Sequence, residues 1–369
     1  MTYKSIDAVQ EELATEFFAR TADAKKASGR ALGTFVEIIT YYLLKQWGLQ
    51  SALSIETRLP EYGNNELTHN VEFTLHKVLS KVEGIPLVLA EDLSNAKISK
   101  EMEFFNDEEF HKSSTKKLLS TKEGFAVIKN GLIVGEKASS IVVANVDSSN
   151  CTYSVAELNK DAYAMFECKR VGKEGNSKGP QTIEKAKQGA YVALMVSSLQ
   201  KVIAPNGEVI GVYFDGNQNP VFGKYDELVD SIIDGRNSSL ANFVLTVGVV
   251  SNHGNWFTAQ NKNKELEVLS HSYDWLLFLS DEGLTKFITD VFKIKACKEA
   301  FKYSYSLNSA TNKKNNNCFT KVNMSYEADK ALTSYFAKNI DEIESWFNVL
   351  NRGDKKIGDL VTQLKNLEK

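Results

Sequence analysis

The sequence has few cysteines and no long apolar run. Among its 369 residues are four cysteines, Cys151, Cys168, Cys297 and Cys318, and no two of them form a CxxC pair. This spacing argues against a structural zinc site and a dense disulfide framework, and it favours a reducing compartment. No stretch approaches the roughly 18 uninterrupted apolar residues of a membrane-spanning helix, and the charged N-terminal segment lacks the apolar core of a signal peptide. We therefore expect a cytoplasmic protein with no membrane contact.

The chain also lacks a strong net charge and several widespread catalytic motifs. It carries 44 basic and 47 acidic side chains, a formal net charge of -3, which excludes a bulk polycation but allows a local basic face. A P-loop, a GxSxG elbow and a GxGxxG turn after a strand are all absent, so ATPase, α/β-hydrolase and dinucleotide-binding functions lack support. The hydrophobic content of 43% is ordinary for a globular protein of one large domain or two moderate ones.

The apolar periodicity changes along the chain. Helical spacing predicts two helices within the first 50 residues, and the C-terminal third is richer in helix. From Phe125 the pattern is that of strands, and Asn130-Gly131 between two apolar runs predicts a β-hairpin. Further predictions are an amphipathic segment over 67–79, helices over 107–120, 182–202 and 339–353, strands over 85–90, 139–147, 151–158, 162–171, 209–215 and 240–250, and a turn at 159–161. This mixture of strands and helices indicates an α/β protein.

Glu167 and Lys169 form the pair of residues whose chemistry stands out. Side chains alternate along a strand, so in DAYAMFECKRVG these two project from one face, while Cys168 and Arg170 take the other. A carboxylate beside an ammonium suits metal-dependent phosphodiester hydrolysis, because the carboxylate binds Mg²⁺ and the ammonium orients the attacking water. Mg²⁺ requires at least one more acidic ligand, so a second carboxylate is expected nearby. Other acid-x-Lys tripeptides occur in the chain, but only this one ends an apolar strand before a glycine-rich loop and a helix.

A strand bearing Glu-x-Lys, an aspartate upstream, a helix-borne glutamate near the N-terminus and a following helix together resemble the PD-(D/E)xK nuclease superfamily, and most of all type II restriction endonucleases. The resemblance covers about residues 30–215. It implies an α/β fold with a restriction-endonuclease-like core, in which helices flank a central mixed β-sheet, plus a helical C-terminal region. The implied division is a nuclease core with N-terminal helices over 1–235 and a DNA-recognition or dimerisation region over 236–369, or one continuous domain.

The resemblance also implies a catalytic and metal-binding set. Glu167 and Lys169 fill the E-x-K positions. Asp147, at the end of a predicted strand, is the preferred upstream aspartate, and Asp161, in the predicted turn, is the alternative. Glu37, at an otherwise apolar helix position, is the candidate for the helix carboxylate. Asp147, Glu167 and Glu37 are then expected to hold Mg²⁺, for which Mn²⁺ can substitute.

Basic and polar residues near this motif are candidates for DNA contacts, because phosphate contacts dominate nucleic-acid affinity. One basic cluster follows the Glu-x-Lys strand, and the segment 293–321 holds seven lysines against the single Glu299, a net +6 within a chain of -3. Polar loops further along the chain supply asparagines, which can pair with adenine, and a histidine. The candidate DNA-binding residues are Arg170, Lys173, Lys178, Lys185, Gln188, His253, Asn255, Lys313 and Lys314.

These observations predict a type II restriction endonuclease that makes Mg²⁺-dependent cuts in double-stranded DNA at a short sequence, in the cytoplasm of a prokaryotic cell. Cutting both strands of a palindrome needs two sites related by a two-fold axis, which predicts a homodimer. Two alternatives stay open. Gln188 and Tyr191 resemble residues of exonuclease-like members of the superfamily and favour a DNA repair or recombination nuclease on the same core. The other alternative is a non-catalytic DNA-binding protein that keeps the fold.

Overall fold

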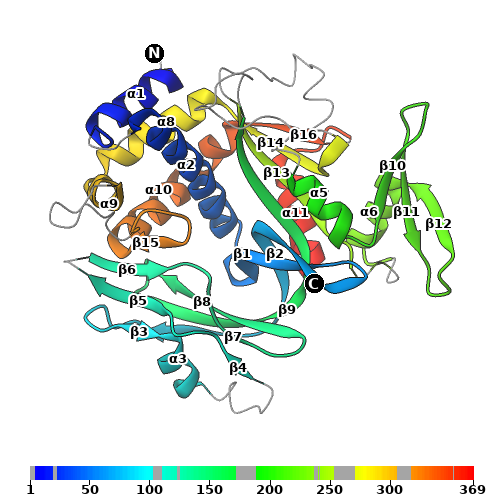
Figure 1. Ribbon diagram of the computed structural model, residues 1–369, viewed down its shortest axis with the longest axis horizontal. Helices are drawn as coiled ribbons and strands as arrows, with labels where there is room; N and C mark the ends of the chain where they lie inside the picture. Colours follow the sequence, from blue (N-terminus) through cyan, green and yellow to red (C-terminus); the bar gives the residue numbers. More distant parts are fainter. Residues whose placement is uncertain are drawn as a thin grey trace.

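The computed structural model describes residues 5–19, 23–102, 110–122, 125–171, 188–236, 240, 242–252, 271–305, 317–351 and 353–369 (Figure 1). Within them, nine strands form one central sheet: β1 (Leu53–Glu61), β2 (Asn64–Pro86), β4 (His111–Lys112), β7 (Leu132–Glu136), β8 (Ser140–Asp147), β9 (Thr152–Val171), β13 (Leu245–Asn252), β14 (Trp275–Leu279) and β16 (Phe347–Asn351). Their order is β16-β14-β13-β9-β8-β7-β4, with β2 paired to β9 and β1 paired to β2. β13 is parallel to both β9 and β14, while β8 and β2 are antiparallel to β9, so the sheet is mixed.

Helices cover both faces of this sheet, which confirms the predicted α/β architecture (Figure 1). The described helices are α1 (Ile6–Glu16), α2 (Ala24–Gln46), α3 (Asn95–Glu101), α5 (Gln188–Val196), α6 (Tyr225–Ile233), α8 (Asp281–Lys293), α9 (Lys295–Tyr305), α10 (Tyr326–Ser345) and α11 (Ile357–Glu368), with a short 3-10 turn at Gln50–Ala52. On one face, Cys168 of β9 meets α2 through a hydrogen bond to Thr40. On the other face, Met165 packs with Ala193 and Val196 of α5. Successive residues of β9 therefore face different helix layers.

An aromatic cluster fixes α2 against the C-terminal helices. The ring of Phe35 lies within 6.1 Å, between centroids, of Phe292 on α8, Phe301 on α9 and Phe319. Phe35 is more than 250 residues from the other three rings in the sequence, and Phe35, Phe301 and Phe319 are fully buried. Packing of this kind sets the position and rotation of α2, and with them the direction of Glu37, two residues after Phe35.

β9 is one continuous strand, so the predicted turn at 159–161 is wrong. Both neighbours of β9 bond to its middle: Asn159 pairs with Ser140 of β8, and Ala162 pairs with His76 of β2. In addition, the N–H of Lys160 donates to the carbonyl of Ser139 at 3.0 Å. Turn-forming side chains do not end a strand whose backbone groups are paired on both sides.

Two smaller sheets flank the central one. They are β10 (Gln200–Ile203), β11 (Val209–Phe214) and β12 (Pro220–Lys224), which project at the right of Figure 1, and β3 (Leu93–Ser94), β5 (Lys117–Lys122), β6 (Phe125–Lys129) and β15 (Asn323–Ser325). The predicted strand over 209–215 is β11, and it lies in the projecting sheet instead of the buried core. The turn at Asn130-Gly131 exists, and Gly131 has a φ of +60°. It is not a hairpin, because β6 pairs with β5 and β15 whereas β7 pairs with β8 and β4.

The structure corrects or refines five other predictions of local structure. The segment 67–79 lies within β2, and only the first residues of 85–90 belong to that strand. The helix predicted over 107–120 is wrong, because its described part contains β4 and the start of β5. The helix predicted over 182–202 ends at Val196 and is followed by β10, and the one predicted over 339–353 ends at Ser345 before β16. In the last two cases, cross-strand pairing with β11 and β14 takes over from helical propensity.

The C-terminal third contributes directly to the central sheet. β13 pairs with β9 over eight residue pairs, and β14 and β16 extend the sheet beyond it. The boundary expected at residue 235 therefore runs through a single sheet, and the region expected to be helical supplies three of its strands. Within the described residues, no helix has the length and apolar character needed to cross a membrane.

Candidate active site

Strands β2 and β9 pair along most of their length and then separate beyond Phe73 and Phe166, and we call this point the fork. Their ladder ends at the pair Phe73 and Phe166, whereas β1 continues to pair with β2 as far as Asn64. Beyond Phe73 the β1–β2 hairpin leaves β9, whose next residues pair only on their other side, with β13. Glu72 and Glu167, the next residue on each strand, lie at the opening of the fork.

The Glu72 carboxylate accepts a hydrogen bond from the backbone N–H of Cys168 at 3.4 Å, which directs it across the gap toward β9. Side-chain exposure is only 9% for Glu72 and 10% for Glu167. Burial raises the pKa of Glu167, the Lys169 ammonium lowers it and the charge of Glu72 raises it, with a net increase. Two buried carboxylates therefore repel each other here, which is an arrangement that attracts a cation.

Lys169 forms an ion pair with Glu167. Burial lowers the pKa of Lys169, but the carboxylates of Glu167 and Glu72 outweigh burial and raise the pKa above its ordinary value. The ammonium is therefore charged at neutral pH. In this state Lys169 donates hydrogen bonds and cannot accept a proton.

Glu37 reaches the same cluster from α2. Burial and the neighbouring Glu72 carboxylate raise the pKa of Glu37 to about 7, against the opposing effect of Lys321. The Glu37 side chain is 27% exposed, so it can be reached from solvent. A carboxyl group with this pKa gains and loses its proton near neutral pH, which suits a general base.

Lys321 joins the cluster from the turn that precedes β15. Its ammonium lies 3.1 Å from the carboxylate of Glu37 and 3.4 Å from that of Glu56, and it also pairs with Glu72. Glu56 of β1 has a left-handed backbone, with a φ of 52°, at the position where the β1–β2 pairing skips from Ile55 to Thr57. Such a conformation is costly for a side chain other than glycine and is often retained at functional sites.

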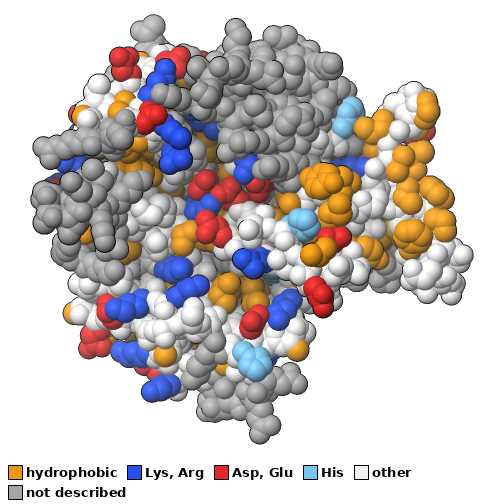
Figure 2. Space-filling view, in the orientation of Figure 1, with side chains coloured by type: hydrophobic (Ala, Val, Ile, Leu, Met, Phe, Trp, Pro, Cys, Tyr) orange, Lys and Arg blue, Asp and Glu red, His pale blue; other side chains and the backbone are white. Residues whose placement is uncertain are grey.

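The cluster has an excess of negative charge. Its four carboxylates, Glu37, Glu56, Glu72 and Glu167, face two ammonium groups, Lys169 and Lys321, among the described residues. Figure 2 shows acidic side chains gathered near the middle of one face of the molecule with basic ones among them. In the described part of the chain no three His, Cys, Asp or Glu side chains already form a ligand set, and Lys321 stands between Glu37 and Glu72. The oxygen donors and the charge imbalance nevertheless fit a hard divalent cation such as Mg²⁺.

Three of the expected site residues belong to this cluster: Glu167 and Lys169 pair with each other, and Glu37 is connected to them through Glu72, whereas Asp147 lies elsewhere. Asp147 ends β8 opposite Thr152, at the far end of β9 from Glu167. That separation is on the order of 50 Å along the strand, at about 3.3 Å per residue. The Asp147 carboxylate accepts hydrogen bonds from the N–H of Ser149 and from the side chain of Asn150, at 3.0 and 2.7 Å. It is therefore a turn-capping residue, and the expectation that it lies beside Glu167 is wrong.

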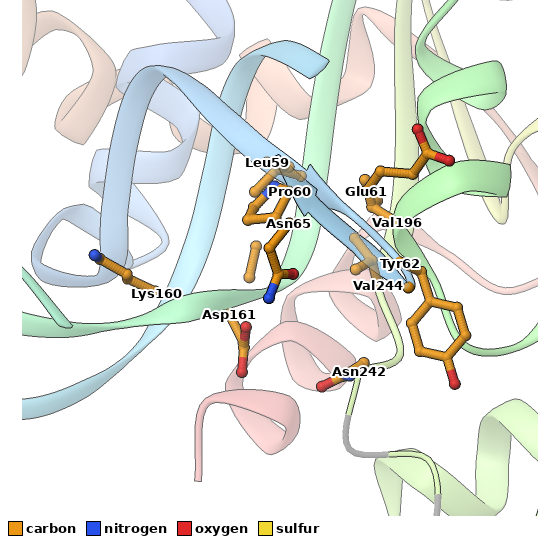
Figure 3. Close-up of a pocket in the computed structure, with 12 residues that line it drawn as sticks. Leu59, Pro60, Glu61, Tyr62, Asn65, Lys160, Asp161, Val196, Asn242 and Val244 are labelled. Carbon is orange, nitrogen blue, oxygen red and sulfur yellow. The ribbon is translucent and has the colours of Figure 1, made fainter. Parts of the chain in front are cut away.

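The alternative aspartate, Asp161, lies away from the cluster as well. It lines a cavity of about 300 Å³ between the tip of the β1–β2 hairpin, the middle of β9 and the end of α5 (Figure 3). Lys160 beside it pairs with Glu136 at 3.4 Å. Six strand residues, roughly 20 Å, separate Asp161 from Glu167, so the two carboxylates cannot share a metal ion.

Arg170 is not available for DNA contacts. It is 7% exposed and points to the face opposite Glu167, where its guanidinium donates to the side chain of Gln10 at 3.4 Å. Burial lowers the pKa of Arg170 to about 10, although the charges of Asp281 and Asp7 oppose this. The other expected contacts Lys173, Lys178, Lys185, His253, Asn255, Lys313 and Lys314 lie outside the described residues, as does the side chain of Gln188.

Glu72, Glu56 and Lys321 are members of the cluster that sequence reasoning missed. The signal for Glu72 was present, because Val71, Phe73 and Leu75 alternate with polar residues, which is the pattern of a half-buried strand. Recognising that strand as the partner of β9 would have placed Glu72 next to Glu167. For Lys321 the excess of lysines in 293–321 suggested a phosphate contact instead of an internal ion pair.

Comparison of the chain with protein-family models, with curated proteins and with solved structures gave no match.

Proposed function

We propose that this chain is a Mg²⁺-dependent DNA endonuclease of the PD-(D/E)xK type, which cuts both strands of double-stranded DNA at a short sequence. The observation that carries the proposal is the fork, where Glu72 on one strand and Glu167 and Lys169 on its partner are held together in a largely buried position. In this assignment Glu72 takes the place expected for the upstream aspartate, and Glu37 is the helix carboxylate.

The carboxylates of Glu72 and Glu167 would hold the Mg²⁺ ion, with Glu37 as the further acidic ligand. When bound, the ion would polarise the scissile phosphodiester and make a water molecule more acidic. Lys169 is charged at neutral pH, so its role is to donate hydrogen bonds to the attacking water and to stabilise the negative charge that develops on the phosphate.

The proposal includes a homodimer, since two cuts at a palindrome need two copies of the fork related by a two-fold axis. Purified protein incubated with unmethylated phage DNA and Mg²⁺ should yield discrete fragments whose ends carry a 5′-phosphate. Progressive degradation from the ends would instead favour the repair or recombination nuclease, and binding without cleavage would favour the non-catalytic protein.

Lys169→Ala and Glu72→Gln should each reduce the cleavage rate by about 100-fold or more, because each removes a group from the proposed reaction centre. Lys160→Ala is the matched control, since Lys160 lies on the same strand and is ion-paired, but to Glu136 outside the cluster. Cleavage by Lys169→Ala as fast as by the parent would refute the assignment. Cleavage by Glu72→Gln as fast as by the parent would refute Glu72 as a metal ligand, and Asp147→Asn should cleave like the parent because Asp147 lies at the other end of β9.

A further inference from the structure

The ammonium of Lys321 has an unusual set of partners. It carries three N–H groups and lies among three carboxylates, those of Glu37, Glu56 and Glu72. Its side chain is 8% exposed. Burial lowers the pKa of Lys321, but the carboxylates outweigh burial and keep it above its ordinary value, so the group is positively charged.

The backbone of Lys321 is fixed by its own network. Its carbonyl accepts a hydrogen bond from the Asn130 side chain at 3.1 Å, and the next carbonyl, of Val322, accepts one from the Asn130 N–H at 2.7 Å. On either side, Thr320 and Asn323 close the turn through mutual hydrogen bonds of 2.8 to 3.2 Å. A hydrogen-bonded turn therefore fixes the backbone position from which the Lys321 side chain extends toward the carboxylates.

Glu72 and Glu37 are the groups that the proposed Mg²⁺ ion also needs. The Lys321 ammonium lies between these two carboxylates, so a divalent cation held by both of them would occupy nearly the same position and the two cations would repel each other. Glu56 is 63% exposed, so it offers Lys321 a partner at the outer side of the cluster that the metal does not require.

We propose that Lys321 is a tethered cation that occupies the metal position of the metal-free protein and competes with Mg²⁺ for Glu72 and Glu37. This inference rests on the proposed function, and it adds that metal entry requires the ammonium to move outward, where Glu56 can retain it. Lys321 therefore sets the metal concentration at which the site fills. It also neutralises part of the acid cluster in the absence of metal.

The test is the affinity for Ca²⁺ alone, measured by isothermal titration calorimetry without DNA, for the parent and for Lys321→Gln. Removal of the competing charge should tighten Ca²⁺ binding at least tenfold. Lys321→Arg keeps the charge and should bind within about threefold of the parent. Lys45→Gln is the matched control, because Lys45 is as buried and is ion-paired to Asp329 at 3.1 Å, but outside the cluster. It should leave the Ca²⁺ affinity unchanged.

Lys321→Gln removes the ammonium that separates the carboxylates, and their mutual repulsion could prevent this variant from folding. A second pair of variants therefore tests the same competition at an unchanged charge balance. Glu56→Gln with Lys321→Gln keeps the excess of two carboxylates and should bind Ca²⁺ at least tenfold more tightly than Glu56→Gln alone. Equal or weaker binding in both Lys321→Gln backgrounds would overturn the role of Lys321 while leaving the proposed function intact. Absence of binding in the parent and in every variant would instead refute the metal site itself, and with it the proposed nuclease.

Discussion

The carboxyl group of Glu37 titrates near pH 7 in the folded chain, compared with an ordinary value of 4.5. Between these two pH values the folded protein binds more protons than the unfolded chain. The free energy of unfolding must therefore fall as the pH rises from about 4.5 to about 7, and the loss is complete above that range. An acidic side chain kept at such a cost is better explained by its chemistry than by its contribution to stability.

Glu37→Gln should for this reason stabilise the protein at pH 8 while it abolishes the proposed activity. We expect a gain of roughly 1 to 2 kcal/mol, because one pKa unit corresponds to about 1.4 kcal/mol and solvent screens part of the shift. At pH 5 the gain should nearly vanish. Urea unfolding at both pH values measures the difference, with the exposed Glu11→Gln on α1 as control. A variant that is less stable than the parent at pH 8 would contradict the prediction.

At the scale of elements, a buried histidine stabilises the pairing of β2 with β9. His76 lies where the register of the two strands shifts, and it is fully buried. Its Nδ1 bonds to the carbonyl of Asn159 at 2.9 Å and its Nε2 to the hydroxyl of Thr74 at 2.7 Å. The carbonyl can only accept, so the proton lies on Nδ1 and the neutral ring accepts from Thr74. Burial lowers the pKa of His76 to about 4, and hydrogen bonding to the backbone of Asn159, Lys160 and Asp161 opposes this effect.

The free energy of unfolding should therefore fall as the pH drops from about 6.5 to about 4, because in this range His76 binds a proton in the unfolded chain but not in the folded one. The loss attributable to His76 is about 3 kcal/mol at most. His76→Gln should destabilise the protein at pH 7, and the difference from the parent should shrink at pH 4.5. His69→Gln, on the same strand but partly exposed, serves as control. A difference of equal size at both pH values would exclude this role for His76.

The elements that the sequence predicted well are those whose signal is local. The helical spacing of Phe35, Ile39 and Tyr42 is enough to define α2, and the apolar run ahead of Asp147 defines β8. β9 could not be recognised as one strand, because the residues at 159–161 favour a turn and only the partners on both sides keep them extended. The same holds for the site: Glu167 and Lys169 stand in one local motif, whereas Glu72 and Lys321 join them through pairings between distant segments.

At the scale of the whole molecule, the C-terminal third completes the sheet on which the cluster is built. Without it, β9 would lose β13, and the apolar side chains of Val247, Val249 and Leu277 would leave the core. Open strand edges and lost apolar contacts favour aggregation. A chain limited to residues 1–235 should therefore be insoluble or melt without a cooperative transition, whereas the full chain melts cooperatively. Circular dichroism during heating distinguishes the two, and a cooperative transition in the shorter chain would show that the nuclease core folds by itself.

The position of Lys321 in the chain also has a consequence for protein synthesis. Glu72 and Lys321 are separated by 249 residues. At roughly 5 to 20 residues per second, the ribosome makes the lysine on the order of 10 to 50 seconds after the carboxylates that it neutralises. During that interval the helix carrying Glu37 and the strands carrying Glu56 and Glu72 have no counter-charge from this turn. The Lys321 counter-charge therefore reaches the cluster only in a chain that has been translated through β15 and has paired β15 with β6.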